Sequence, residues 1–268
     1  MTLRSRMAMV RGSYWPVVFG SMLAIVVVGF ATGIDPARVL AATIVVGLAL
    51  AWMWPRSARY FLQRTVRDYQ ARVEAAIADG DDDTRNRLLD EIDEYYAGFG
   101  ARFDRQRARM RASRLGGDER WSEALVIVEA IDRDQLPAAE RSGHDNALAW
   151  FCAHAGQTAR AVELARAAVA APAPARLRPY LLGTLGAALV LDGQHAAAVG
   201  PLREALASDG PRWTQTVRRY YLGIALAALG RLDEARAEWQ KSVTIAPRSR
   251  WGRRAQERLD AGAPAAYR

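Results

Sequence analysis

The chain has 268 residues, 51% of them apolar, and its 37 basic and 29 acidic side chains give a formal net charge of +8. This length allows one or two domains with a buried core, and the composition excludes a disordered tail. A single cysteine, Cys152, excludes an intramolecular disulfide framework and a cysteine-rich zinc site. With only three histidines, His144, His154 and His195, we expect no bound metal and no cofactor.

The positive charge is concentrated near the N-terminus. Residues 1–67 hold eight arginines and one acid, Asp35, whereas residues 68–268 hold 29 basic and 28 acidic side chains. A nucleic-acid-binding domain carries a basic patch on its folded surface. Because the rest of the chain is nearly neutral, we do not expect nucleic acid to be a partner.

Two apolar stretches predict a transmembrane helical hairpin within residues 1–55. We expect the spans at about 14–32 and 39–54, because both interiors are uncharged and a helix of about 20 residues crosses a bilayer. Gly33 and Pro36 mark the turn between them. A cleaved signal peptide is the alternative for the first stretch. The second stretch follows at once, which favours the hairpin.

The flanks of these stretches predict an orientation. Arginines precede the first stretch and follow the second, and the loop between them has only one, Arg38. The positive-inside rule then places both termini on the cytoplasmic side of a bacterial inner membrane. The lipid bilayer is thus an expected partner, and the side chains expected at its interface are Arg11, Tyr14, Trp15, Trp52, Trp54, Arg56 and Arg59.

Residues 56–99 predict a membrane-proximal pair of amphipathic helices. Apolar side chains recur at steps of three and four residues on either side of a break around Gly80. An acidic segment, residues 79–94, precedes a basic one, residues 102–114. The basic segment either binds anionic lipid headgroups or pairs with the acidic segment beside it. We favour pairing, because neighbouring helices of opposite charge need no external partner.

The region from residue 100 to 247 repeats with a period of 37 residues. Four columns carry the repeat: Leu148, Leu185 and Leu222; Gly156, Gly193 and Gly230; Ala161, Ala198 and Ala235; and Ala168, Ala205 and Ser242. The glycines fall where a helix ends in a left-handed residue. Small residues at Ala149, Gly186 and Gly223 allow two helices to approach closely. The pattern therefore predicts stacked helix-turn-helix units.

The last unit resembles a tetratricopeptide repeat. Its matching residues are Leu222, Gly223, Leu226, Gly230, Ala235, Trp239, Ser242 and Pro247. Two earlier units match less fully, and a degenerate one lies a period before them, at Trp121 and Ala124. Each unit is three residues longer than the 34 of the family. The resemblance implies an all-α solenoid of about three clear units and one degenerate unit, which follows the predicted hairpin.

Residues 248–268 resemble the polar helix that closes such an array. Trp251, Ala255 and Leu259 lie on one side of it, and five arginines lie between residues 248 and 258. The arginines either keep the exposed face soluble or form a basic docking patch.

The resemblance also implies a concave groove lined by the first helix of each unit. Carried over to this sequence, the groove positions are Asn146, Trp150, His154, Tyr180, Thr184, Tyr220, Tyr221 and Ile224, together with Arg109, Ser113 and Val190. Aromatic side chains of this kind suit an extended or helical protein segment. The alternative for each ring is packing between the repeats.

The sequence shows none of the common signatures of phosphate-binding loops, dinucleotide-binding sites, zinc proteases or serine hydrolases. We therefore expect no catalysis. The chain is interpreted as a membrane-anchored scaffold that binds a protein partner through the groove. In the alternative, it is a regulatory or assembly subunit of a membrane enzyme or secretion complex, and the hairpin is the main partner-binding element. A homo-oligomer is also possible.

Overall fold

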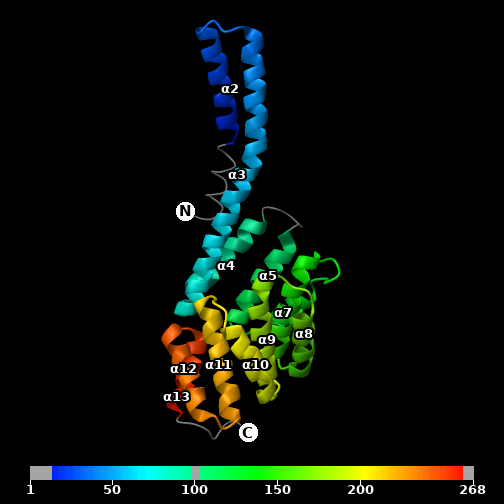
Figure 1. The fold of residues 1–268 in the computed structure, drawn as a ribbon, viewed down its shortest axis with the longest axis vertical. Coiled ribbons are helices and arrows are strands. Elements are labelled where there is room, and N and C mark those ends of the chain that lie inside the picture. Colours follow the sequence, from blue (N-terminus) through cyan, green and yellow to red (C-terminus); the bar gives the residue numbers. More distant parts are fainter. Residues whose placement is uncertain (1–13, 98–102, 262–268) are drawn as a thin grey trace. The chain divides into compact units, whose positions relative to one another are not determined.

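The structure is a computed structural model that describes residues 14–97 and 103–261. All regular secondary structure in this part of the chain is helical, which confirms the predicted all-α class (Figure 1). The chain divides into two compact units, Met1–Ala71 and Arg72–Arg268, and the boundary falls inside a long helix. Each unit is described separately below.

The first unit contains α2 (Tyr14–Ala31) and the beginning of α3 (Pro36–Asp79). Gly33 adopts a positive φ of 66° in the turn between them, and the Asp35 carboxylate accepts a hydrogen bond from the backbone N–H of Ala37 at 3.0 Å. The two helices are closely packed at Gly29, where an added Cβ would lie 2.4 Å from a Val39 methyl carbon. A hairpin of two apolar helices is therefore present.

The predicted transmembrane character of this hairpin is not supported. In the part of the chain that the structure describes, no helix is both long enough and apolar enough to span a bilayer. The predicted location in a bacterial inner membrane, with both termini cytoplasmic, is therefore wrong.

The second unit contains the end of α3 and a series of shorter helices. They are α4 (Asp82–Ala97), α5 (Asp104–Gly117), α6 (Trp121–Glu129), α7 (Ala138–His154), α8 (Thr158–Ala170), the 3-10 turn η2 (Ala175–Leu177), α9 (Arg178–Leu191), α10 (His195–Leu206), α11 (Arg212–Ala228), α12 (Leu232–Ile245) and α13 (Arg250–Asp260). From α5 to α12 they form helix pairs, and the first helices α7, α9 and α11 also pack on one another (Figure 1). The chain is a helical repeat array, as the 37-residue period predicts.

The turn inside each clear unit has the same geometry. Gly156, Gly193 and Gly230 have φ values of 85°, 77° and 78°, which an L-residue with a side chain rarely adopts. The next residue donates its backbone N–H to the carbonyl five residues earlier in every case, as from Gln157 to Cys152 at 2.9 Å. The predicted left-handed glycines are therefore confirmed.

The degenerate first unit, α5 and α6, makes this turn without glycine. Glu119 lies one period before Gly156 and has a φ of 61°. Its neighbour Arg120 donates its backbone N–H to the carbonyl of Leu115 at 2.9 Å, as in the other units. The fold thus repeats the turn where the sequence signal is missing.

Small residues let the paired helices approach closely. A Cβ added to Gly223 would lie 2.3 Å from the indole nitrogen of Trp239, and one added to Gly186 would lie 2.4 Å from Leu202. The same column holds the fully buried Ala149 and Ala112 in the two earlier units. The prediction of close approach at these positions is confirmed.

Ion pairs connect α4 to α5. Arg107 and Arg111 both lie near Asp93, at 3.1 and 3.4 Å, and Arg114 pairs with Asp90. The basic segment therefore pairs with the acidic segment that precedes it, which was the favoured alternative from the sequence.

Candidate partner-binding pocket

The second unit encloses a pocket of about 490 Å³ on the side of the array formed by its first helices. Each of α5, α7, α9 and α11 contributes lining residues, among them Ser113, Asn146, Tyr180 and Val217. Helix α13 and the end of α3 close other parts of the wall. The pocket is therefore formed largely by the first helices, which the resemblance implied would line a groove.

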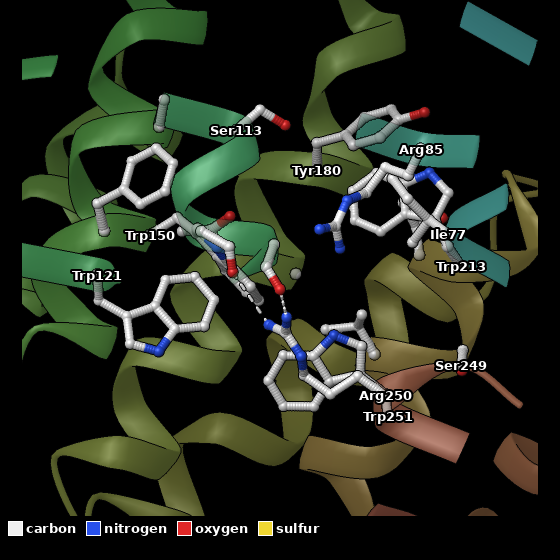
Figure 2. Close-up of a pocket in the computed structure, with 18 of the residues that line it drawn as sticks. Ile77, Arg85, Ser113, Trp121, Trp150, Tyr180, Trp213, Ser249, Arg250 and Trp251 are labelled. Carbon is white, nitrogen blue, oxygen red and sulfur yellow. Dashed lines mark hydrogen bonds between the residues drawn. The ribbon is translucent and has the colours of Figure 1, made fainter. Parts of the chain in front are cut away.

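The pocket wall combines aromatic rings with guanidinium groups. Figure 2 shows Trp121, Trp150, Tyr180, Trp213 and Trp251 around it. Among the described residues, five arginines and one acidic side chain, Asp82, also line the pocket; the arginines are Arg85, Arg109, Arg218, Arg250 and Arg253. The wall is thus apolar and positively charged.

Helix α13 reaches the first helix pair of the array, α5 and α6, and forms one wall of the pocket. The Arg250 guanidinium donates hydrogen bonds to the carbonyls of Gly116, at 3.1 Å, and Gly117, drawn as dashed lines in Figure 2. Arg250 also pairs with Glu119 at 3.2 Å and lies 5.5 Å from the centroid of the Trp121 ring. The last helix of the array is therefore attached to the first turn.

An aromatic cluster lies beneath this wall. The Trp251 ring centroid lies 5.3 Å from those of Tyr220 and Tyr221 and 6.2 Å from that of Trp150. Partly buried His154 joins this cluster, with ring nitrogens 2.9 Å from the Trp150 carbonyl and 2.9 Å from the Tyr221 hydroxyl. Burial lowers the pKa of His154 to about 4, and burial also raises the pKa of Tyr221. Both side chains are therefore neutral at neutral pH.

The eight groove residues predicted from the sequence fall into two sets. Four of them line the pocket: Asn146, Trp150, Tyr180 and Thr184. The other four do not: Tyr220 and Tyr221 are buried under Trp251, His154 is in the aromatic cluster, and Ile224 packs against the core. The structure therefore brings together the predicted residues of α7 and α9 at the pocket and places the predicted residues of α11 below it.

Helix α11 supplies different residues, which the sequence reasoning missed. Trp213, Val217 and Arg218 line the pocket one to two helical turns before Tyr221. A signal for them is present in the sequence, because Val217 lies one 37-residue period after Tyr180. The position one period after Tyr180 thus indicates that this part of α11 lines the pocket.

Of the residues predicted for a membrane interface, only Trp52 has a described side chain, which is 62% exposed. Arg11 lies outside the described residues, as do the side chains of Tyr14, Trp15, Trp54, Arg56 and Arg59. The exposed side chains of this unit are largely apolar and include Phe19, Leu23 and Leu48, at 61%, 64% and 66%.

Cys152 lies in the core of the second unit and is fully buried. Burial raises the pKa of its thiol, so the thiolate is disfavoured. No group of three or more metal-ligating side chains occurs among the residues that the structure describes.

No family model matches the sequence, and no curated protein matches it. A solved structure described as "MamA MSR-1 C2" is similar to this chain with a TM-score of 0.40 and 22% sequence identity. The match covers 59% of this chain and 88% of that one.

Proposed function

We propose that the chain is a non-catalytic scaffold that binds a protein partner in the pocket on the concave side of its repeats. The observation that carries this proposal is the pocket of about 490 Å³, to which each first helix from α5 to α11 contributes. A pocket of this size with aromatic walls accommodates a few side chains of a peptide segment.

The chemistry of the nearby nucleophile and base supports a binding role. The Cys152 thiol has a raised pKa, and His154 has both ring nitrogens within hydrogen-bonding distance of other groups. A catalytic cysteine needs a lowered pKa and an accessible base. These two residues are better explained as parts of the core.

The experiment is a selection of random dodecapeptides by the full-length chain, repeated with two matched glycine variants. Gly143 in α7 lines the pocket, and a Cβ added there meets no atom within 4 Å, so Gly143→Trp fills the pocket without a clash at its base. Gly200 in α10 has the same open surroundings but does not line the pocket. Gly200→Trp is therefore the control.

We expect the selected peptides to bind the wild-type chain and Gly200→Trp equally and to lose at least tenfold in affinity for Gly143→Trp. Peptides that bind all three proteins alike would show that the pocket is not the binding surface and would overturn the proposal.

The apolar hairpin is a second candidate for the binding element. Its large exposed side chains, such as Leu23 in α2 and Leu48 in α3, suit contact with helices of a partner. If the selected peptides lose affinity for the double variant Leu23→Gln, Leu48→Gln and not for Gly143→Trp, the hairpin is the main binding surface.

A further inference from the structure

Arg218 in α11 is a buried cation that has no acidic partner among the described residues. Arg218 is 4% exposed, and its Nη1 donates a hydrogen bond to the Ala205 carbonyl at 2.9 Å. The guanidinium carbon lies 5.4 Å from the centroid of the Tyr180 ring. Among the residues that the structure describes, no carboxylate forms an ion pair with Arg218, and burial lowers the pKa of its guanidinium. A charge held in this way is costly to the fold unless another group compensates it.

The other buried or partly buried arginines of the pocket differ from Arg218 in this respect. Arg85 pairs with Asp82 at 2.5 Å and with Asp118 at 2.7 Å. Arg109 pairs with Glu140 at 3.1 Å. Arg250 pairs with Glu119 at 3.2 Å. Arg253 also has no carboxylate partner among the described residues, but it is exposed to solvent. Among the buried and partly buried arginines of this wall, the missing carboxylate is therefore particular to Arg218.

Two further donors of the pocket lack an acceptor among the described residues. They are the Trp213 indole nitrogen and Arg109 Nη2, both buried. An unpaired buried donor costs about 1–3 kcal/mol, so native proteins seldom leave one without a function. One buried acceptor of the pocket, Asn146 Oδ1, also lacks a partner among these residues. Together with Arg218, the two donors still outnumber it and give the pocket a surplus of donors and positive charge, which favours a ligand that carries acceptors and negative charge.

The surrounding backbone leaves space for the Arg218 side chain. A Cβ added to Gly183 in α9 would lie 3.0 Å from Arg218 Nε, so a larger residue there would press on the guanidinium group. Thr184, next to Gly183, and Thr214 on α11 also line the pocket. The guanidinium group is therefore held between α9 and α11 at the wall of the pocket.

We propose that the pocket recognises an acidic peptide segment, in which a Glu or Asp carboxylate pairs with Arg218 and an adjacent apolar side chain packs against the aromatic walls. A planar guanidinium group binds a carboxylate through two parallel hydrogen bonds, which gives direction as well as charge. The Trp150 and Trp213 rings supply the apolar surface on either side of the pocket in Figure 2. This inference rests on the proposed peptide-binding function and specifies the chemistry of the partner.

The test uses the dodecapeptides that the full-length chain selects from the random library. We expect Asp or Glu next to an aromatic or aliphatic residue in the enriched sequences. One such peptide and its counterpart with Gln or Asn in place of the acid are then labelled, and the dissociation constants are measured by fluorescence anisotropy. The proteins are the wild type, Arg218→Gln and Arg236→Gln. Arg236 is an exposed arginine of α12 outside the pocket and serves as the matched control.

The acidic peptide should bind Arg218→Gln at least tenfold more weakly than the wild type, and Arg236→Gln should behave like the wild type. The counterpart peptide with Gln or Asn should bind the wild type and Arg218→Gln alike, because it has no carboxylate to pair with Arg218. If circular dichroism shows that Arg218→Gln is unfolded, Arg218→Lys takes its place, since it keeps the charge and removes the bidentate geometry, and at least a threefold loss is expected.

Two results would overturn the inference while leaving the proposed function intact. In one, the peptides lose affinity for Gly143→Trp but show no enrichment of acidic residues. In the other, the acidic peptide binds the Arg218 variant as tightly as the wild type. Peptides that bind Gly143→Trp as tightly as the wild type would instead overturn the proposed function itself. The failure of the inference and the failure of the proposed function are therefore distinguishable.

Discussion

The first and last helix pairs of the array fold alike from unlike sequences. The last pair, α11 and α12, has glycine both at its turn, Gly230, and at its helix contact, Gly223. The first pair, α5 and α6, has Glu119 and Ala112 in the same columns. The repeated geometry therefore does not depend on one residue type at each column. A side chain is accepted where it has space or a contact of its own.

The helix contact of the last pair should be the position most sensitive to substitution. In Gly223→Leu, the new side chain must displace the fully buried Trp239 ring, and overpacking of this kind costs about 3 kcal/mol. Denaturant unfolding followed by circular dichroism measures the loss of stability. In the control variant Gly200→Leu, the new side chain has open space, and helix propensity predicts a small gain of about 0.5–1 kcal/mol. Equal stability of Gly223→Leu and wild type would show that the two pairs do not differ in how closely their helices pack.

The next effect concerns His154, which contacts both ends of the array. Its ring centroid lies 4.4 Å from that of Trp121 in the first pair, and its ring lies within hydrogen-bonding distance of the Tyr221 hydroxyl in the last. The pKa of His154 is lowered from 6.5 to about 4 in the folded state, so the unfolded chain takes up the proton first as the pH falls. The stabilisation is fully present above pH 6.5 and is lost as the pH falls to about 4.

Between pH 7 and pH 5, the free energy of unfolding should therefore fall by roughly 2 kcal/mol more in the wild type than in His154→Gln. Urea unfolding of both proteins at the two pH values measures this difference, in which the contributions of other titrating groups cancel. The same pH dependence in both proteins would contradict a neutral, buried His154.

Substitutions at the turns of the last and first helix pairs should change the stability least. Gly230→Glu places a side chain at a φ of 78° and should destabilise the chain by about 1 kcal/mol. In Glu119→Gly, the relief of the same backbone strain is opposed by the loss of contacts with Arg250 and Arg254, so stability should change by less than about 0.5 kcal/mol. Thermal unfolding compares the two. A large gain in Glu119→Gly would mean that the contacts with α13 contribute little.

Much of the array could be predicted from the sequence, because a fixed period reports local geometry. The left-handed glycines, the small helix contacts and the polar pairing of α4 with α5 all follow from residues close in sequence or one period apart. The N-terminal hairpin shows the limit of this reasoning. Apolar content and charged flanks suggested a membrane span, but the described helices are not long and apolar enough for one.

The pocket could be predicted only in part. The family resemblance identified Asn146, Trp150, Tyr180 and Thr184, because these residues lie on first helices that line the pocket. It failed for Tyr220 and Tyr221 because Trp251 covers these rings. That contact depends on how far the array curves, and curvature results from small rotations added over several units. The repeat signature in the sequence gives no direct information on this curvature.

The attachment of Arg250 to the Gly116 and Gly117 carbonyls has a consequence for the length of the array. An open solenoid gains or loses a unit at little cost, since each unit touches only its neighbours. Here, one additional 37-residue unit would carry the last helix away from the first turn, and one fewer would leave it short of that turn. The contact between the last helix and the first turn thus fixes the number of units. Duplication of a unit would separate α13 from that turn and break the contact.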